Sequence, residues 1–229
     1  MASIAGKLQQ VRQRIGAACA VAQRPVQSVT LLAVSKTFSV EAIREAHGAG
    51  QRAFGENYVQ EALVKIHALG DLRAAIEWHL IGPLQSNKTR EVAAAFDWVH
   101  SVDRLKLAER LSAQRPPALP PLQVCLQVNT SGETSKSGVA PAEVPALARA
   151  LAALAHLRLR GLMAIPEPAA DLAAQRRAHR ALRELLDALR ADGLALDTLS
   201  MGMSDDLEAA IAEGATIVRV GSAIFGRRV

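Results

Sequence analysis

The chain has 229 residues, of which 50% are hydrophobic and only 3% aromatic, and its formal net charge is +5. This length suits one large domain or two small ones, and the aliphatic residues suffice for a full core. Cys19 and Cys125 lie far apart and outside any CxxC spacing, which argues against a disulfide framework or a zinc site. No apolar run reaches transmembrane length and the N-terminus has no secretory apolar segment, so we expect a cytoplasmic protein.

The chain begins with a basic segment that allows two interpretations. Residues 1–40 contain lysine and arginine but no acid, as organelle transit peptides do. Ile4, Leu8, Val11 and Ile15, however, recur at helical spacing and lead straight into the first apolar run. We therefore expect a structural helix here.

Eight short apolar runs then alternate with amphipathic stretches. The runs, which predict strands, cover residues 29–35, 52–55, 76–81, 97–102, 122–128, 157–163, 196–201 and 215–220. The amphipathic stretches, which predict helices, cover residues 39–49, 58–69, 88–95, 104–114, 141–155, 171–192 and 204–213. Helix-start signals stand at Ser39, Asp103 and Ser204, and glycines that close helices at Gly50, Gly70, Gly193 and Gly214.

Eight strands alternating with helices predict a parallel sheet. At this length a closed (β/α)8 barrel of the TIM type, with an extra N-terminal helix, is the best solution. An open doubly wound sheet is the alternative, but the first βα turn reads Ser-Lys-Thr and lacks a Gly-rich dinucleotide fingerprint. The proline-rich stretch 115–121 only joins a helix to the fifth strand, so we expect residues 1–229 to form one domain.

Arginines are concentrated in the predicted helix 171–192, which raises the possibility of nucleic-acid binding. No aromatic stacking set, recognised motif or zinc spacing accompanies them, and acids are mixed into the same helix. We therefore expect a solvated arginine-rich face and no nucleic-acid partner. The arginines are Arg176, Arg177, Arg180, Arg183 and Arg190.

Lys36 stands where the first buried strand ends and a loop begins. In such barrels the functional residues come from the C-terminal strand ends and the loops after them. By strand alternation Lys36 shares a face with Val34 and Leu32, and that face can point into the barrel. Desolvation there would lower the pKa of the amine and make it a nucleophile for an aldehyde. A solvated lysine beside a loop is the ordinary alternative.

The ends of the last two strands resemble a phosphate cradle. The segment from Met201 to Ser204 turns from a strand into a helix that Ser204 would cap, and Gly221 and Ser222 follow the eighth strand. Glycines and free amides after strands seven and eight commonly bind phosphate in barrels. Asp205 and Asp206 oppose an anion unless they point to solvent. An amine and a phosphate cradle at one barrel mouth fit pyridoxal 5′-phosphate.

Arg219 lies in an otherwise apolar strand, so it needs a partner when buried. A core carboxylate is one possibility, and the pyridine nitrogen of the cofactor is the other. Because arginine stays protonated, it would leave that nitrogen unprotonated, and an unprotonated ring is a poor electron sink. Asn57 and His79 could contact the ring or its hydroxyl, or could satisfy loop backbone; the histidines form no metal-ligand spacing.

Five motifs together resemble the pyridoxal phosphate homeostasis proteins, the PROSC-like family. They are Leu-Ala-Val-Ser-Lys at 32–36, Phe-Gly-Glu-Asn-Tyr-Val-Gln-Glu at 54–61, Trp-His-Leu-Ile-Gly-Pro-Leu-Gln-Ser-Asn-Lys at 78–88, Ser-Met-Gly-Met-Ser-Asp-Asp at 200–206 and Val-Arg-Val-Gly-Ser-Ala-Ile-Phe-Gly at 218–226. The resemblance spans nearly the whole chain, with no departure at these motifs.

This resemblance implies a barrel related to the N-terminal domain of alanine racemase. Lys36 would carry pyridoxal phosphate covalently as a Schiff base, and Arg219 would face the pyridine nitrogen. Ser204, Gly221 and Ser222 would hold the phosphate, with Met201, Asn57 and His79 as further cofactor-binding candidates. The family binds and buffers the cofactor without an established turnover reaction, and dependent apo-enzymes are its possible recipients.

The residues themselves also favour a carrier over an enzyme. Racemisation needs acid–base groups on both faces of the substrate carbon, and Lys36 supplies one. The only tyrosine, Tyr58, follows strand two, and no second domain follows strand eight, which also makes a monomer the expected state. The rivals are a pyridoxal phosphate racemase or lyase and a Schiff-base aldolase acting on a sugar phosphate, which would place a buried acid or lysine beside Lys36.

The loop from Asn129 to Val139, after strand five, is polar and contains Lys136. It could form a second anion site or a flap, but we expect a solvated loop. On that interpretation Lys136→Ala leaves the Schiff base at Lys36 intact.

Overall fold

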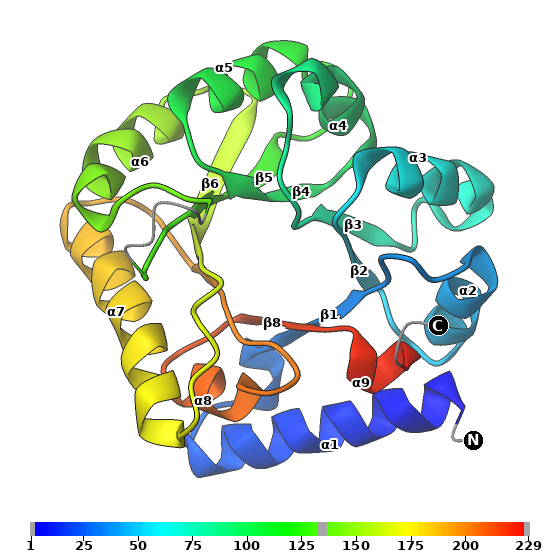
Figure 1. Ribbon diagram of the computed structural model, residues 1–229. Helices are drawn as coiled ribbons and strands as arrows, with labels where there is room; N and C mark the ends of the chain where they lie inside the picture. Colours follow the sequence, from blue (N-terminus) through cyan, green and yellow to red (C-terminus); the bar gives the residue numbers. More distant parts are fainter. Residues whose placement is uncertain (1–2, 132–136, 227–229) are drawn as a thin grey trace.

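The computed structural model describes residues 3–131 and 137–226 and contains a closed barrel of eight parallel strands in the order β1 to β8 (Figure 1). Every strand pairs with its neighbours in sequence, and β8 closes the barrel on β1. The strands are β1 (Thr30–Val34), β2 (Ala53–Glu56), β3 (Glu77–Leu80), β4 (Trp98–Val102), β5 (Leu122–Gln127), β6 (Leu157–Met163), β7 (Thr198–Ser200) and β8 (Ile217–Val220).

Helices surround the barrel as an outer ring (Figure 1). They are α1 (Ile4–Val21), α2 (Val40–Gly48), α3 (Val59–Ala68), α4 (Thr89–Ala95), α5 (Leu105–Gln114), α6 (Val144–Ala152), α7 (Leu172–Ala191), α8 (Leu207–Ala212) and α9 (Ser222–Phe225). Short 3₁₀ turns lie at η1 (Val26–Ser28), η2 (Gly70–Leu72), η3 (Ser86–Lys88) and η4 (Pro141–Glu143).

The predicted barrel is confirmed, and the open doubly wound sheet is wrong, because β8 pairs with β1 from Thr30 to Ala33. Each predicted strand and helix is present within a few residues. The expected N-terminal helix is α1, which contacts α2, α8 and α9 along the outside of the barrel. None of the helices in the described ranges is long and apolar enough to cross a membrane.

The predicted helix starts were less accurate than the helices. Ser39 caps α2, since its side chain accepts a hydrogen bond from the amide of Ala42 at 3.4 Å. Asp103 does not cap α5; its carboxylate pairs with Arg104, which occupies the cap position. Ser204 does not cap α8 either, because the chain first makes a turn and the helix begins after Asp206.

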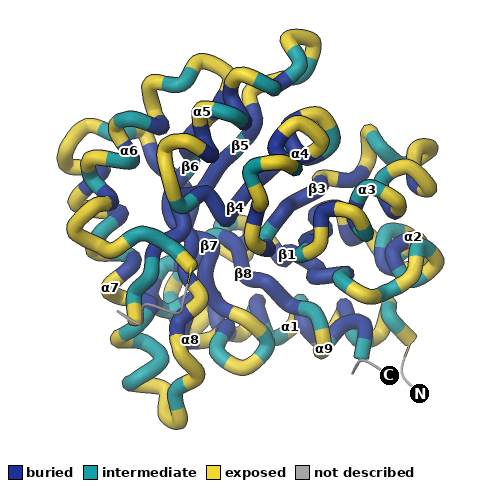
Figure 2. The backbone as a smooth tube through the Cα atoms, turned by 45° about the horizontal axis from the view of Figure 1, so that its top comes forward, coloured by how far each residue is buried: buried dark blue, intermediate teal, exposed yellow. Residues whose placement is uncertain are grey.

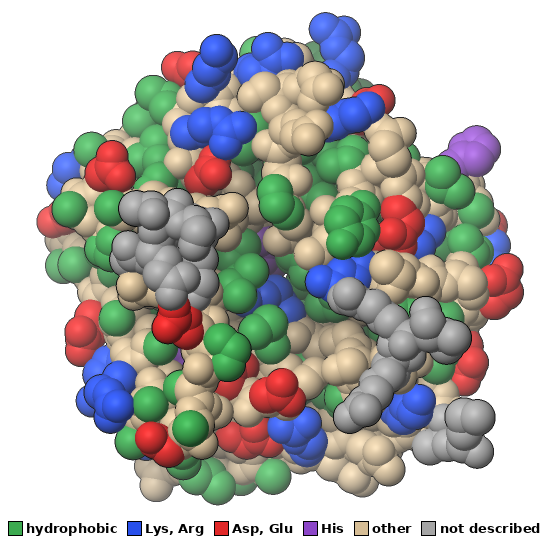
Figure 3. Space-filling model, in the orientation of Figure 1, with side chains coloured by type: hydrophobic (Ala, Val, Ile, Leu, Met, Phe, Trp, Pro, Cys, Tyr) green, Lys and Arg blue, Asp and Glu red, His purple; other side chains and the backbone are tan. Residues whose placement is uncertain are grey.

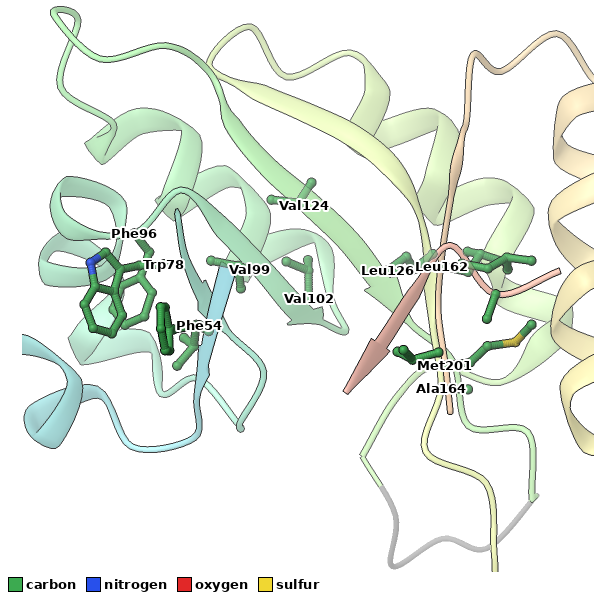
Figure 4. Close-up of a cluster of buried hydrophobic side chains, with 14 of the residues drawn as sticks. Phe54, Trp78, Phe96, Val99, Val102, Val124, Leu126, Leu162, Ala164 and Met201 are labelled. Atoms are coloured by element: carbon green, nitrogen blue, oxygen red, sulfur yellow. The ribbon is translucent and has the colours of Figure 1, made fainter. Parts of the chain in front are cut away.

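Two apolar layers arise from the alternation of side chains along the strands. The larger layer fills the space between strands and helices, and Figure 4 shows part of it around Phe54, Trp78 and Phe96. A smaller cluster fills the barrel interior, formed by Leu32, Ala53, Trp98, Cys125, Met163 and Ile217. The buried strands and the exposed outer faces of the helices are separated clearly in Figure 2. The interior is thus a packed core, and a cavity opens at each of its two ends.

The arginine-rich face of α7 is not simply solvated, which corrects the expectation from sequence. Three of its arginines converge on Glu213, whose side chain is fully buried: Arg176 donates at 2.7 Å, Arg183 at 2.8 Å and Arg180 at 3.1 Å. Burial by itself raises the pKa of Glu213, but these hydrogen bonds and charges outweigh it and hold the pKa below its ordinary value.

Because its pKa is lowered, Glu213 should contribute to the free energy of unfolding in a way that depends on pH. A carboxyl whose pKa is lower in the folded state stabilises the fold above its unfolded pKa, about 4.3 for glutamate, and loses that contribution as the pH falls through the folded pKa. Chemical denaturation between pH 7 and pH 3 should therefore show a shallower acid decline in Glu213→Gln than in the unchanged protein. Glu109→Gln, at an exposed position on α5, is the control and should keep the full decline.

Candidate functional site

A cavity of about 480 Å³ opens at the C-terminal end of the barrel. Figure 3 shows this face hollowed at its centre, with basic side chains inside the hollow. Polar groups from four loops line it, and apolar side chains form the rest of the wall: Val34, Phe38, Ile81, Ile165 and Met203. Its size is that of a site for a small organic molecule.

Six of the eight residues predicted for the site line this cavity. They are Lys36, Asn57, Ser204, Arg219, Gly221 and Ser222. Four separate βα loops or strand ends bring them together, after β1, β2, β7 and β8. The cavity therefore contains an amine, a guanidinium, an amide and two hydroxyls around one space.

Met201 and His79, the other two predicted cofactor-binding residues, do not line this cavity. Met201 is fully buried on the helix side of the sheet, beside Leu162 and Ala164 (Figure 4), and Met203 lines the cavity in its place. The prediction treated the β7 loop as a unit, although successive side chains of an extended segment point to opposite faces. His79 lies inside the barrel, within β3, below the mouth.

Lys36 projects from a tight turn that the structure holds on both sides. The amide of Ser35 donates to the carbonyl of Gly55 at 2.9 Å, and the amide of Thr37 donates to Glu61 at 2.6 Å. Thr37 has φ 67°, in the left-handed region that residues other than glycine seldom adopt. This turn aims the Lys36 side chain into the cavity instead of along the barrel wall.

A buried ion pair beneath this turn was not predicted from the sequence. Lys65, on α3, donates to the carbonyl of Ser35 at 2.7 Å, to Glu56 at 2.8 Å and to Glu61 at 2.5 Å. The hydroxyl of Ser35 donates to the same oxygen of Glu56 at 2.7 Å. The pair thus connects α3 and β2 to the backbone on each side of Lys36. Its sequence signal was the Glu-x₄-Glu-x₃-Lys spacing after β2, which places the second acid and the lysine one helical turn apart.

Burial disfavours the charged form of Glu56. Its side chain is fully buried, and burial raises its pKa although Lys65 and two hydrogen bonds counteract that rise. One oxygen of Glu56, Oε2, has no hydrogen-bond partner among the residues that the structure describes. The carboxylate therefore depends on Lys65 for its charge compensation.

Arg219 is buried on β8 and lines the floor of the cavity. Its guanidinium donates to the carbonyl of Ser200 at 2.6 Å, to the hydroxyl of Ser200 at 2.9 Å and to the carbonyl of Ala164 at 2.9 Å. No carboxylate bonds it, so the core-carboxylate alternative is wrong for the described residues. Burial lowers its pKa to about 10, and Asp206 opposes that fall, so the group remains a cation at neutral pH.

A chain of polar side chains continues from Arg219 down the inside of the barrel. The hydroxyl of Ser200 contacts Nδ1 of His100 at 2.8 Å, and Nε2 of His100 contacts Nδ1 of His79 at 2.9 Å. Nε2 of His79 then contacts Glu77 at 3.1 Å, at the opposite end of the barrel. Burial lowers the pKa of His100 well below its ordinary value, with the charges of His79 and Arg219 acting in the same direction, so His100 is neutral.

The loops after β7 and β8 form the wall assigned to an anion. Asp206 points away from the cavity: its carboxylate bonds His179 at 2.9 Å and accepts from the amide of Met203 at 2.6 Å. Asp205 is exposed and does line the cavity. Gly221 packs closely against β1, since a Cβ atom there would come within 3.1 Å of the carbonyl oxygen of Val34. Ser222 then opens α9 at the cavity wall.

Asn57 leaves a polar atom unsatisfied at this site. Its Oδ1 is buried and has no hydrogen-bond partner in the described protein, although the residue lines the cavity. A buried acceptor without a donor costs about 1–3 kcal/mol. A bound molecule that presents a hydroxyl or N–H to the cavity would satisfy it.

Residues 7–229 match the family model described as the alanine racemase N-terminal domain. The chain is 63% identical over 228 residues to the pyridoxal phosphate homeostasis protein of Pseudomonas aeruginosa, with 100% of this chain and 97% of the relative covered. It is 54% identical over 229 residues to the protein of the same name from Escherichia coli, covering 100% and 98%. The chain belongs to the pyridoxal phosphate homeostasis protein family.

Solved structures agree with this membership. The structure of PipY from Synechococcus elongatus with pyridoxal phosphate bound has a TM-score of 0.85 and 42% identity, covering 98% of this chain and 100% of that one. An unknown protein from Bifidobacterium adolescentis has a TM-score of 0.91 and 40% identity, covering 97% and 94%. Alanine racemase from Corynebacterium glutamicum, at 19% identity, has a TM-score of 0.74, with 98% of this chain and 61% of that chain covered, and shares the fold.

Proposed function

We propose that this protein binds pyridoxal 5′-phosphate as a reversible Schiff base on Lys36 and supplies it within the cell. The observation that carries this proposal is the joint presence of Lys36, Arg219 and the β7 and β8 loops around one cavity of about 480 Å³. Membership of the homeostasis family and the cofactor bound in PipY support the same ligand. The amine would add to the aldehyde carbon with loss of water, and hydrolysis would reverse the bond.

Besides Lys36, five residues of the lining have a role in this proposal. Arg219 would face the pyridine nitrogen and, as a cation, keep it unprotonated. Ser204, Gly221 and Ser222 would hold the phosphate, with the first amides of α9 directed at it. The unsatisfied Oδ1 of Asn57 would accept a hydrogen bond from the ring hydroxyl or another donor of the ligand. His79 would act only through the chain that supports Arg219.

A carrier role without turnover fits the groups around Lys36. Tyr58 is 54% exposed at the start of α3 and does not line the cavity. Among the residues that the structure describes, the ionisable side chains in the lining are those of Lys36, Arg219 and the exposed Asp205. A racemase needs a second acid–base group poised on the opposite face of the substrate carbon, and the described part of this lining does not supply a buried one. Steady conversion of an amino acid by protein free of other enzymes would overturn the carrier role.

A sugar-phosphate aldolase is the rival that one observation favours. It requires a buried acid or lysine near Lys36, and Glu56 and Lys65 lie directly beneath the turn. Both are locked to each other and neither lines the cavity, so they are not available to a substrate. We therefore retain the cofactor-binding function and expect dependent apo-enzymes as recipients and a monomeric protein.

The deciding experiment is a visible absorption spectrum with added pyridoxal phosphate, followed by borohydride reduction and peptide mass mapping. We expect an absorption band of a Schiff base and a pyridoxyl group trapped on Lys36. Absence of the band, or label scattered over surface lysines, would return the aldolase to first place. Lys136, which we expect to be dispensable, lies outside the described residues, and its alanine variant should still be labelled at Lys36.

A further inference from the structure

A second cavity, of about 570 Å³, opens at the N-terminal end of the barrel, opposite to Lys36. The strand starts of β3 to β5 and the first half of β6 contribute to it, together with residues just before β2. We call it the base cavity. Five arginines line it: Arg52, Arg73, Arg115, Arg158 and Arg160. This end of a (β/α)8 barrel ordinarily serves stability, so a concentration of cationic groups there needs an explanation.

Two of these arginines are neutralised by acids. Arg73 forms a bidentate pair with Asp97, at 2.8 and 3.1 Å. Arg160 forms one with Asp197, at 2.6 and 2.8 Å. The geometry of both pairs is the parallel fork that carboxylates favour.

The other three have no acid bonded to them within the described ranges. Arg115, which is 4% exposed, donates to the carbonyls of Ala93, Phe96 and Pro120. Arg52 donates only to backbone carbonyls, and Arg158 is exposed on β6.

Glu77, the remaining acid in the described lining, already bonds other side chains of the protein. Glu77 accepts from the indole N–H of Trp98 at 2.7 Å through one oxygen and contacts His79 through the other. The base cavity therefore carries an excess of positive charge, which an anion would neutralise.

The same residues restrict the chemistry of that anion. The described residues of the lining include no lysine, so they could not hold an aldehyde as a Schiff base. The indole of Trp98 is engaged by the protein itself, with His79 stacked on it at 5.3 Å and Arg160 over its ring at 4.9 Å, and offers little to an aromatic ligand. A guanidinium group can bind a phosphoryl group through two parallel hydrogen bonds, as it binds a carboxylate.

We propose that the base cavity is a second ligand site, which binds a small phosphoryl anion of the pyrophosphate type without a covalent bond. Arg52 and Arg158 would contact the anion directly, because their guanidinium groups are exposed and not paired with acids. Arg115 would contribute positive charge from beneath. The site is separate from the Lys36 cavity and does not depend on the function proposed for it.

The two tryptophans provide a direct test with inorganic pyrophosphate at constant ionic strength. Trp98 lines the base cavity, whereas Trp78 is fully buried in the outer core. In ¹⁵N–¹H spectra, assigned with Trp98→Phe, the indole signal of Trp98 should shift in a saturable way and that of Trp78 should stay in place. The polar chain that ends at Glu77 connects the Lys36 cavity to the indole of Trp98, so the shift must also depend on the arginines of the base cavity. A Trp98 signal that stays in place would overturn the proposal, and so would a shift that Arg52→Gln and Arg158→Gln leave unchanged.

Single substitutions then show which arginines contact the pyrophosphate. Arg52→Gln and Arg158→Gln change exposed side chains, and each should weaken pyrophosphate binding about tenfold, the loss expected for one charge-assisted contact. Arg177→Gln, on the exposed face of α7, removes the same charge far from the cavity and should leave the affinity unchanged. Equal weakening by all three variants would indicate general charge attraction and would refute a site.

Discussion

Replacing Lys65 with methionine is expected to lower the free energy of unfolding by about 3–5 kcal/mol, because it leaves a buried carboxylate without its counter-charge. Glu56 would lose the 2.8 Å contact with Lys65, and the carbonyl of Ser35 would lose its 2.7 Å donor. Both groups are buried, so water cannot replace the ammonium without rearrangement. Urea denaturation at pH 7.5 measures the effect.

The pH dependence of this loss has a definite sign. Burial already raises the pKa of Glu56, and removal of Lys65 would raise it further. A carboxyl whose pKa is higher in the folded state stabilises the fold at low pH and loses that contribution as the pH rises through the folded value. The deficit of Lys65→Met should therefore shrink between pH 7.5 and pH 5.

Two further variants make this interpretation falsifiable. Lys88→Met removes a lysine whose pair with Glu91 lies on the surface, and it should cost at most about 1 kcal/mol. The double variant Lys65→Met with Glu56→Gln removes the unpaired charge and should recover part of the stability. If the double variant is as unstable as Lys65→Met alone, the loss comes from packing and not from the buried charge.

Replacing Lys36 with arginine should abolish the Schiff base while leaving the fold intact. Arginine keeps the positive charge and most of the bulk, but its guanidinium does not condense with an aldehyde at neutral pH. The absorption band should disappear completely, and the apparent affinity for pyridoxal phosphate should fall at least tenfold, about 1.4 kcal/mol, because only the phosphate and ring contacts remain. Absorption titration and equilibrium dialysis measure the two effects.

The matched control for this prediction is Lys88→Arg, which makes the same change outside the cavity. It should keep the band and the affinity of the unchanged protein. A band of full height in Lys36→Arg, with the pyridoxyl label on another lysine after reduction, would contradict the assignment of Lys36.

The residues at the cavity were predictable to the extent that they depend on strand periodicity. Lys36 continues the face of Val34 and Leu32, so alternation alone placed it toward the inside of the barrel. Arg219 was singled out as a charge in an apolar strand, and the structure pairs it in register with Leu32. The side-chain direction of Met201 and the predicted helix cap at Ser204 failed for the opposite reason. The turn after β7 depends on the bond between Asp206 and the amide of Met203, and a local pattern does not reveal that bond.

The residues that support the cavity were harder to predict from the sequence. In the sequence Lys65 looks like an ordinary helix lysine. Only the packing of α3 against β2 brings it to Glu56 and the carbonyl of Ser35. The base cavity likewise unites residues from five separate segments of the chain. Such contacts are set by how the elements pack against one another, and a single sequence gives no direct record of that packing.

The polar chain inside the barrel has a consequence for its hydrogen atoms. The carboxylate of Glu77 can only accept, so a neutral His79 must carry its proton on Nε2 and accept at Nδ1. His100 must then also be the Nε2–H tautomer, and the hydroxyl of Ser200 must donate to its Nδ1. Every dipole in this row points the same way, with its negative end toward the Arg219 cation and its positive end toward Glu77. The barrel interior is therefore polarised along its axis, and a change of charge at one mouth alters the electrostatic potential at the other.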